Sequence, residues 1–332
     1  MPADVIVERP TIVSDEEYAR LVGDIATWEP MARAALDLTG IPQPAELRIA
    51  HPLGTYPTLL TGSPRRLVIK LFGDRYSGPE SHATEYASYE ILGAHDLPVP
   101  DLIAAGDLFP GAPDREWTWP FLILTELPGG LYAELAPGLD GGQRATIAGE
   151  LGELLRRLHG LPLPPPAAGW PLASSWDRFM MMLQRRRREA SGEQRRLGLL
   201  PPHLCEQLDG WLPDPDQLVD KSRAPVFVHG DLHAEHVFVD PEQATLAGII
   251  DFTDAYAGDC RYDLVALHVG TFGLDPTLLR ACLEAYGWEP DGDWPRDMLA
   301  FTLLHDFNMF RADIGLDRFS SLDGLANAIW DC

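Results

Sequence analysis

The first part of the chain is a succession of short apolar runs separated by turn residues. A helical region is predicted over about 14–39, where WEPMARAALDL carries apolar residues at helical spacing. A second helix is predicted over roughly 79–95. The strand-like runs cover 46–54, 56–62, 66–73, 101–109 and 119–127. The first three strands are separated by turn residues and favour an antiparallel meander.

After Gly129 and Gly130 the pattern becomes helical. Helices are predicted over 143–159 and about 174–197, and the chain from residue 261 onward is mostly helical. Two strand-like runs, 225–231 and 244–252, flank a polar segment between these helices. The pattern predicts an α+β protein in two lobes. We place a β-rich N-lobe with an antiparallel sheet at 1–124, a hinge at 125–130 and a larger, mainly helical C-lobe at 131–332. A ligand cleft is expected at such a boundary.

Charge is the part of the composition that adds most to this picture. Fifty acidic and 26 basic residues give a formal net charge of −24. Such a field repels nucleic acid and anionic membranes and attracts cations, although a solvated acidic surface without a function is equally consistent with it. No apolar run approaches the roughly 20 residues of a membrane span. We therefore expect no nucleic-acid or membrane partner, and we expect a monomer.

The cysteines and the first residues point to the cytoplasm. The four cysteines are far apart and form no CxxC pair, so neither a zinc ribbon nor a disulfide framework is indicated. The opening residues MPADVIVERP lack the basic region and apolar run of a signal peptide. A reducing, cytoplasmic location fits both observations.

Residues 229–236, HGDLHAEH, are the densest group of reactive side chains in the chain. They could be a zinc cluster, a phosphoryl-transfer loop or a polar turn between strands. The side chains able to bind zinc are His229, Asp231, His233 and His236. If the segment were a strand, alternate residues would point the same way, and Leu232 and Val237 would interrupt a compact cage. This argument disfavours zinc, and we expect a structural role for His229.

Phosphoryl transfer needs a base-like carboxylate, a bound cation on the phosphates and a positive side chain on the nucleotide. Asp231 with His236 five residues later supplies the first two. The second strand-like run ends in GIIDF, and Asp251 in this segment is expected to bind magnesium. Lys70 lies in the strand LVIKLF, and Glu85 follows fifteen residues later in the predicted helix. Each of these residues alone has a structural alternative, such as a surface lysine or a turn-forming aspartate. The functional interpretation rests on their order and spacing together.

At these residues the chain resembles the aminoglycoside phosphotransferases, which have the bilobal protein-kinase-like fold. HGDLHAEHVFVD is similar to their catalytic loop, and IIDFTDAYAGDCRYDL is similar to their DFG-equivalent segment. The stretches TWEPMARAAL, VIKLFG and AFTLLHDF are most similar to the hygromycin B 7''-O-kinase type. The resemblance covers nearly the whole chain.

The resemblance implies a role for each matching residue. Asp231 matches the catalytic aspartate, and His236 and Asp251 match the magnesium ligands. Lys70 matches the lysine that contacts the phosphates, and Glu85 matches its helix partner. The remaining nucleotide-binding positions implied by the family are Thr125 and Leu127 in the hinge, and Gly54 and Thr55 in the loop over the phosphates.

The sequence departs from the hygromycin type at two positions. His236 stands where that type usually has asparagine, and histidine there is similar to the macrolide phosphotransferases and the 2''-aminoglycoside kinases. Thr253 replaces the glycine of the DFG-equivalent triplet. The first departure leaves the second metal ligand and the acceptor open.

The resemblance implies transfer of the γ-phosphoryl group of ATP or GTP, with Mg²⁺, to a hydroxyl of a cationic antibiotic, foremost hygromycin B. Asp254, Tyr256 and Asp306 are the first candidates for binding this substrate, because carboxylates attract ammonium groups and aromatic rings pack on sugars. Asp306 is expected within an apolar helix, where a charge needs a partner. Alternatives are a macrolide or other aminoglycoside kinase, a metabolic small-molecule kinase, and a non-catalytic pseudokinase.

Overall fold

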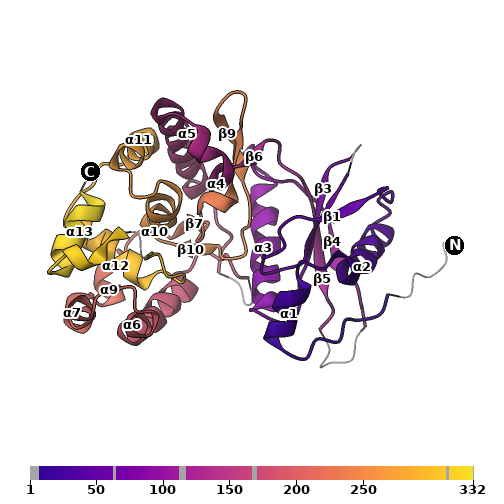
Figure 1. The fold of residues 1–332 in the computed structure, drawn as a ribbon, viewed down its shortest axis with the longest axis horizontal. Coiled ribbons are helices and arrows are strands. Elements are labelled where there is room, and N and C mark those ends of the chain that lie inside the picture. Colours follow the sequence, from indigo (N-terminus) through magenta and orange to yellow (C-terminus); the bar gives the residue numbers. More distant parts are fainter. Residues whose placement is uncertain (1–6, 63–64, 112–116, 167–169, 312–313, 332) are drawn as a thin grey trace. The chain divides into compact units, whose positions relative to one another are not determined.

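The structure, a computed structural model, describes residues 7–62, 65–111, 117–166, 170–311 and 314–331. The chain divides into two compact units, Met1–Leu127 and Pro128–Cys332 (Figure 1). This division falls inside the segment 125–130 that the sequence suggests as a hinge. Each unit is described by itself below.

The first unit is built on a five-stranded antiparallel sheet with the strand order β1-β2-β3-β5-β4. Its strands are β1 (Leu47–Ile49), β2 (Thr58–Thr61), β3 (Leu67–Leu71), β4 (Leu102–Asp107) and β5 (Pro120–Thr125). All five lie within the strand-like runs of the sequence and are shorter than them. β1, β2 and β3 form the predicted meander, and β5 pairs on both sides, with β3 and β4.

Helices cover both faces of this sheet (Figure 1). They are α1 (Asp15–Leu21), α2 (Ile25–Leu38) and α3 (Gly78–Leu92). The single helical region predicted over 14–39 is therefore two helices. The break occurs because the Asp24 carboxylate accepts a hydrogen bond from the Ala26 amide and starts α2 as a new helix.

The alternation along β3 sends apolar and charged side chains to opposite faces of the sheet. Ile69 and Leu71 are fully buried in a core that also contains Trp28 and Met31 of α2. Lys70 lies between them in sequence and therefore points to the other face, which α3 covers. This is how a lysine in an apolar strand comes to be buried beside a helix.

The second unit is mainly helical, as predicted. Its longer helices are α5 (Gly141–His159), α6 (Asp177–Leu197), α11 (Pro276–Tyr286), α12 (Trp294–Leu304) and α13 (Leu322–Trp330). Its shorter helices are α4 (Tyr132–Leu135), α7 (Pro202–Cys205), α8 (Leu208–Trp211), α9 (Pro215–Leu218) and α10 (Arg261–Val265), with the π-helix η3 (Ala266–Thr271) and the 3-10 turns η1 (Ala136–Gly138), η2 (Ala234–His236) and η5 (Leu316–Arg318).

Two small antiparallel sheets complete this unit: β6-β8-β9 and β10-β7. Their strands are β6 (Gly130–Leu131), β7 (Val226–Val228), β8 (Val237–Asp240), β9 (Thr245–Ile249) and β10 (Tyr256–Gly258). β7 and β9 correspond to the two predicted strands, but each pairs with a short strand that the sequence pattern does not reveal. The polar segment therefore leaves one sheet and enters another.

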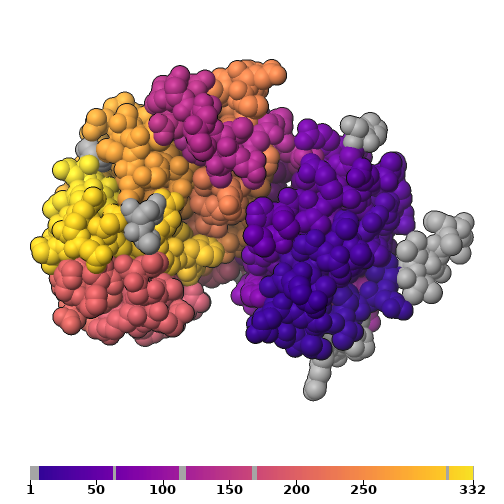
Figure 2. Space-filling view, in the orientation of Figure 1, coloured from indigo at the N-terminus to yellow at the C-terminus, as the bar shows by residue number. Residues whose placement is uncertain are grey.

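The longer helices of the second unit pack against one another. α5 packs along α11, and α12 contacts α13, α10 and α6. Figure 2 shows the C-terminal helices directly against the segment that contains α6. Within the described residues, no helix is long and apolar enough to cross a membrane.

Candidate active site

In the first unit, Lys70 and Glu85 form a buried ion pair. The Lys70 Nζ lies 2.8 Å from Glu85 Oε2, and the two side chains are 9% and 1% exposed. The ammonium also lies 5.7 Å from the centre of the Tyr56 ring and 5.5 Å from that of Phe72. Glu80 and Glu90, the other candidates for the helix partner, are exposed. The carboxylate holds the ammonium in place.

The other nucleotide-binding candidates of this unit lie at strand ends. Gly54 and Thr55 belong to the turn between β1 and β2. Thr125 ends β5, its amide donates to the Asp101 carbonyl at 3.0 Å, and its hydroxyl accepts from the Asp101 amide at 2.8 Å. Leu127 is the last residue of the unit and is 9% exposed.

In the second unit, the loop 229–231 leaves β7 through a turn that only glycine can make. Gly230 has φ +85°, and a Cβ at this position would lie 2.0 Å from the carbonyl oxygen of Asp254. His229 is fully buried, with its Nε2–H donated to the Ile250 carbonyl and its Nδ1 accepting from the Asp231 amide. The expected structural role of His229 agrees with these contacts.

Asp263 fixes this loop from α10. Its carboxylate accepts hydrogen bonds from the amides of His229 at 3.0 Å and Gly230 at 2.8 Å, and from Nε2–H of His159 at 3.0 Å. Burial by itself would raise the pKa of Asp263, but the hydrogen bonds and the nearby histidines outweigh it and lower the pKa. Asp263 is therefore ionised and structural, and it does not line a substrate site.

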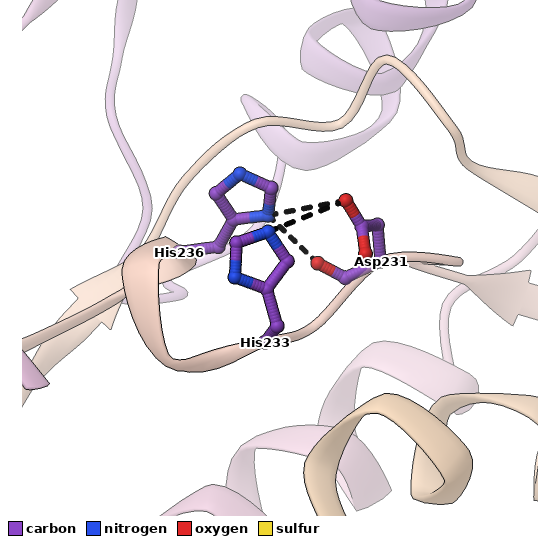
Figure 3. A group of neighbouring side chains, drawn as sticks. All are labelled: Asp231, His233 and His236. Atoms are coloured by element: carbon purple, nitrogen blue, oxygen red, sulfur yellow. Dashed lines mark hydrogen bonds and ion pairs between the residues drawn. The ribbon is translucent and has the colours of Figure 1, made fainter. Parts of the chain in front are cut away.

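Asp231, His233 and His236 lie together (Figure 3). The Asp231 Oδ2 is 3.5 Å from His233 Nε2 and 3.8 Å from His236 Nδ1, and His236 Nδ1–H donates to the Asp231 carbonyl at 2.7 Å. The strand argument against a compact cage is wrong, because the segment folds as the 3-10 turn η2, in which residues three apart eclipse one another. One possible ligand atom from each side chain lies within 4.8 Å of the others.

The electrostatics of this group favour an ionised aspartate. Burial opposes the charge of Asp231, but its hydrogen bond to His233 and the nearby histidines lower its pKa. Burial lowers the pKa of His236, which favours its neutral form. A neutral imidazole has one lone pair, so it can bind a cation through one nitrogen.

Asp251 is positioned by the turn after β9. It has φ +67°, an uncommon backbone conformation that aspartate tolerates and that is typical of functional sites. The Thr253 hydroxyl lies 2.7 Å from Asp251 Oδ1 and 3.0 Å from Asp254 Oδ2. The Ile250 amide donates to the His236 carbonyl at 3.0 Å, which ties the Asp251 turn to η2.

His236 and Asp251 are suited to hold one cation. Because Nδ1 of His236 carries the donated proton, its lone pair is on Nε2, and Nε2 lies 3.7 Å from Asp251 Oδ2. Magnesium prefers oxygen ligands, and imidazole is a weaker ligand for it. The carboxylate fits magnesium well and the histidine fits it less well.

The three substrate candidates lie in the same unit as Asp231. Tyr256 is in β10, opposite Val228, and its ring lies 3.6 Å from the position a Gly230 Cβ would occupy. Asp306 lies two residues beyond the end of α12, so the prediction that it lies within the helix is wrong. Its carboxylate accepts from the Tyr256 hydroxyl at 2.7 Å and from Arg185 at 2.6 Å. An arginine thus already balances the charge of Asp306.

Sequence reasoning missed four contributors to this region. They are His159, Arg185, Thr253 as a hydroxyl donor, and Asp263 as the anchor of the loop. Only Asp263 had a signal, since the Asp-Leu that ends the DFG-equivalent segment contains it. Arg185 lies in α6, 121 residues before Asp306, and nothing in its local sequence indicates that contact.

The fold and these two groups of side chains define a kinase-like protein, with an antiparallel sheet and a lysine–glutamate pair in one unit and a His-x-Asp loop in the other. Solved structures share this fold. One is the GDP and kanamycin complex of APH(2'')-IIia, with a TM-score of 0.60 and 18% identity, covering 82% of this chain and 88% of that one. Another is macrolide 2'-phosphotransferase MphH from Brachybacterium faecium, with a TM-score of 0.54 and 20% identity, covering 82% and 88%.

The chain belongs to the phosphotransferase enzyme family, whose sequence model matches residues 58–299. It is 27% identical over 271 residues to an aminoglycoside 3'-phosphotransferase of Streptomyces ribosidificus, covering 73% of this chain and 91% of that protein. It is also 25% identical over 203 residues to lysine-specific demethylase JMJ21 of Arabidopsis thaliana. That match covers 51% of this chain and spans only 21% of the demethylase.

Proposed function

We propose that this protein is an antibiotic kinase that transfers the γ-phosphoryl group of ATP or GTP to a hydroxyl of an aminoglycoside or aminocyclitol, foremost the 7''-hydroxyl of hygromycin B. The observation that carries the proposal is the grouping of Asp231, His236 and Asp251 on one loop and one adjoining turn. Family membership and the aminoglycoside 3'-phosphotransferase relative support the same chemistry.

Asp231 would act on the acceptor. Its ionised carboxylate would accept a hydrogen bond from the substrate hydroxyl, orient it toward the phosphorus atom and take its proton late in the reaction. The lowered pKa of Asp231 keeps it in the required form at neutral pH. Asp263 would act indirectly, by fixing the backbone that presents Asp231.

Asp251 and His236 would hold magnesium. When bound, magnesium neutralises charge on the β- and γ-phosphates. Thr253, through its hydroxyl, would orient the Asp251 carboxylate for that task.

Lys70 would contact the phosphates, with Glu85 holding its ammonium in place. In the hinge, the Thr125 amide is already bonded to Asp101, so a purine edge would use the Thr125 carbonyl and the Leu127 amide. Gly54 and Thr55 would cover the phosphates from the turn between β1 and β2.

Tyr256, Asp254 and Asp306 would bind the antibiotic. Asp254 offers a carboxylate for an ammonium group, and the Tyr256 ring offers a surface for a sugar. Because Arg185 and Tyr256 already engage the Asp306 carboxylate, we propose that Asp306 mainly holds Tyr256 in position.

Mass spectrometry tests the proposal. Hygromycin B incubated with the enzyme, magnesium and ATP or GTP should gain one phosphoryl group. Asp231→Asn should lower turnover by orders of magnitude, about 10² to 10⁴, because the base is lost. Its circular dichroism should stay unchanged, and the exposed Asp209→Asn should keep full turnover. Near-normal turnover of Asp231→Asn would refute the role of Asp231.

A macrolide kinase is the second candidate. The Arg185–Asp306 ion pair supports it, because it leaves less uncompensated negative charge for a polycationic drug. His236 in the metal position supports it as well. A panel of hygromycin B, kanamycin and erythromycin with either triphosphate separates the two candidates. Phosphorylation of erythromycin alone would support the macrolide kinase and would refute the hygromycin B kinase.

A further inference from the structure

Three potential metal ligands lie close together beside η2. His233 Nε2 lies 3.5 Å and His236 Nδ1 lies 3.8 Å from Asp231 Oδ2 (Figure 3). Because His236 Nδ1 donates to the Asp231 carbonyl at 2.7 Å, the His236 ring would turn away from that carbonyl to bind an ion. In a tetrahedral zinc site with bonds of about 2.1 Å, neighbouring ligand atoms lie about 3.4 Å apart. The three side chains are 14% to 30% exposed, so an ion can reach them from solvent.

We propose that Asp231, His233 and His236 form a second, inhibitory metal site for a borderline-soft divalent ion such as Zn²⁺, which shares His236 with the proposed magnesium position on His236 and Asp251. Two imidazoles and one carboxylate are a common zinc donor set, with water in the fourth position. The inhibitory part rests on the proposed function, since it assumes that Asp231 is the catalytic base. The binding part does not.

The local fold holds His233 in the geometry that such a site needs. Its ring packs against that of His236, with centroids 3.9 Å apart and the planes tilted at 39°. The Cβ of His233 packs against Gly270 of η3, where an added Cβ would lie 3.2 Å away and would displace it. If Nε2 of His233 binds an ion, Nδ1 carries the proton and no longer accepts the hydrogen bond from the Glu235 amide. This hydrogen bond is long, at 3.3 Å, and its loss costs little.

His236 makes the two metal positions mutually exclusive. The magnesium position uses the Nε2 lone pair and needs the proton on Nδ1, where it bonds to the Asp231 carbonyl. The zinc position uses Nδ1 and needs the proton on Nε2, which would then face the Asp251 carboxylate 3.7 Å away. A carboxylate accepting the second imidazole N–H is the usual support of a zinc-bound histidine. One ring cannot adopt both states at once.

Occupation of the zinc position would stop the reaction at two points. Asp231 would be bound to the ion and would no longer accept the proton of the substrate hydroxyl. His236 would no longer be available to magnesium. Inhibition by zinc should therefore be relieved by excess magnesium and should not depend on the choice of antibiotic.

Calorimetric titration of the nucleotide-free protein with Zn²⁺ tests the site, and the visible absorption of Co²⁺ reports its geometry. We expect one ion per chain at this site. His233→Gln should weaken Zn²⁺ affinity at least about tenfold and relieve the inhibition in parallel, since one of three protein ligands is lost. Two control variants, His95→Gln at an exposed position and Cys260→Ala, should leave the Zn²⁺ affinity unchanged.

The outcomes separate the two proposals. Equal Zn²⁺ affinity in wild type and His233→Gln would overturn the site, whatever the activity. Tight binding that depends on His233 without inhibition of a demonstrated phosphotransfer would overturn the inhibitory role. Absence of phosphotransfer to every antibiotic, with binding dependent on His233, would refute the proposed function and leave the metal site standing.

Discussion

At the scale of single residues, the most consequential contact is the buried pair of Lys70 and Glu85. Two charges 2.8 Å apart with almost no exposure to water stabilise each other only as long as both are present. The pair keeps an ammonium ready in an otherwise apolar strand. It therefore links the folding of the first unit to the proposed nucleotide contact.

Lys70→Met should lower the free energy of unfolding by about 3–5 kcal/mol, because Glu85 loses the ammonium beside it and remains buried. The double variant Lys70→Met, Glu85→Gln should regain most of this loss. Urea unfolding of the two single variants and the double variant measures the coupling. Both variants that lack Lys70 should also have a raised KM for the nucleotide. Additive losses in the double variant would contradict the coupling.

At the scale of elements, the loop that presents Asp231 depends on α10. Asp263, on that helix, accepts from two consecutive amides of the loop and from His159 of α5. Three elements therefore meet at one carboxylate. The His159 ring is held from its other side, where Nδ1 accepts from the Tyr286 hydroxyl of α11 at 3.0 Å.

The lowered pKa of Asp263 predicts a specific dependence of stability on pH. A carboxyl whose pKa is lower in the folded state stabilises the protein at pH values above its unfolded pKa of about 3.9, and this stabilisation is lost as the pH falls through the folded value. Asp263→Asn should lower the free energy of unfolding by about 3 kcal/mol or more at pH 7, because the asparagine amide cannot accept hydrogen bonds from all three donors.

The difference in unfolding free energy between wild type and Asp263→Asn should be constant from pH 7 to pH 5 and should shrink below about pH 4. Urea unfolding across this range measures it, with Asp209→Asn as the control that shows no such change. A difference that stays constant down to pH 3 would mean that Asp263 does not titrate as described.

The sequence predicted the elements that lie in long patterned segments and missed those that do not. The strands of the first sheet lie within longer apolar runs bounded by turn residues, and α5, α6 and α11–α13 have enough residues to show a helical period. β6, β8 and β10 have two to four residues each, and their existence depends on partners elsewhere in the chain. The 3-10 turn η2 is equally invisible, and mistaking it for a strand hid the approach of His233 to Asp231.

The candidate site was predictable for those residues whose order and spacing along the chain indicate a role. The order of Lys70, Glu85, Asp231, His236 and Asp251 is visible in the sequence, and the structure places Lys70 beside Glu85 and His236 beside Asp251. Contacts between distant segments were not predictable. The ion pair between Arg185 and Asp306 changes what the Asp306 carboxylate can bind. This ion pair depends on how α6 packs near α12.

At the scale of the whole molecule, the net charge of −24 acts on both proposed substrates with opposite sign. It attracts a polycationic antibiotic and repels a nucleoside triphosphate. Local groups such as Lys70 compensate for this repulsion only at short range.

Salt should therefore shift the two Michaelis constants in opposite directions. Raising the ionic strength from about 0.1 M to about 1 M shortens the Debye length from about 10 Å to about 3 Å. The KM for hygromycin B should rise and the KM for the nucleotide should fall, as measured by initial rates with potassium chloride. Parallel shifts of both constants would show that the overall field does not contribute.

The anchoring of the loop by Asp263 also bears on how the protein is made. The amides of His229 and Gly230 are synthesised 34 and 33 residues before the carboxylate that receives them. A nascent chain that has been synthesised as far as Asp251 already contains the proposed phosphate-binding, catalytic and metal-binding side chains. It does not yet contain α10, which fixes the loop. Competence for catalysis is thus acquired late in translation, and a product that ends prematurely before Asp263 would be inert.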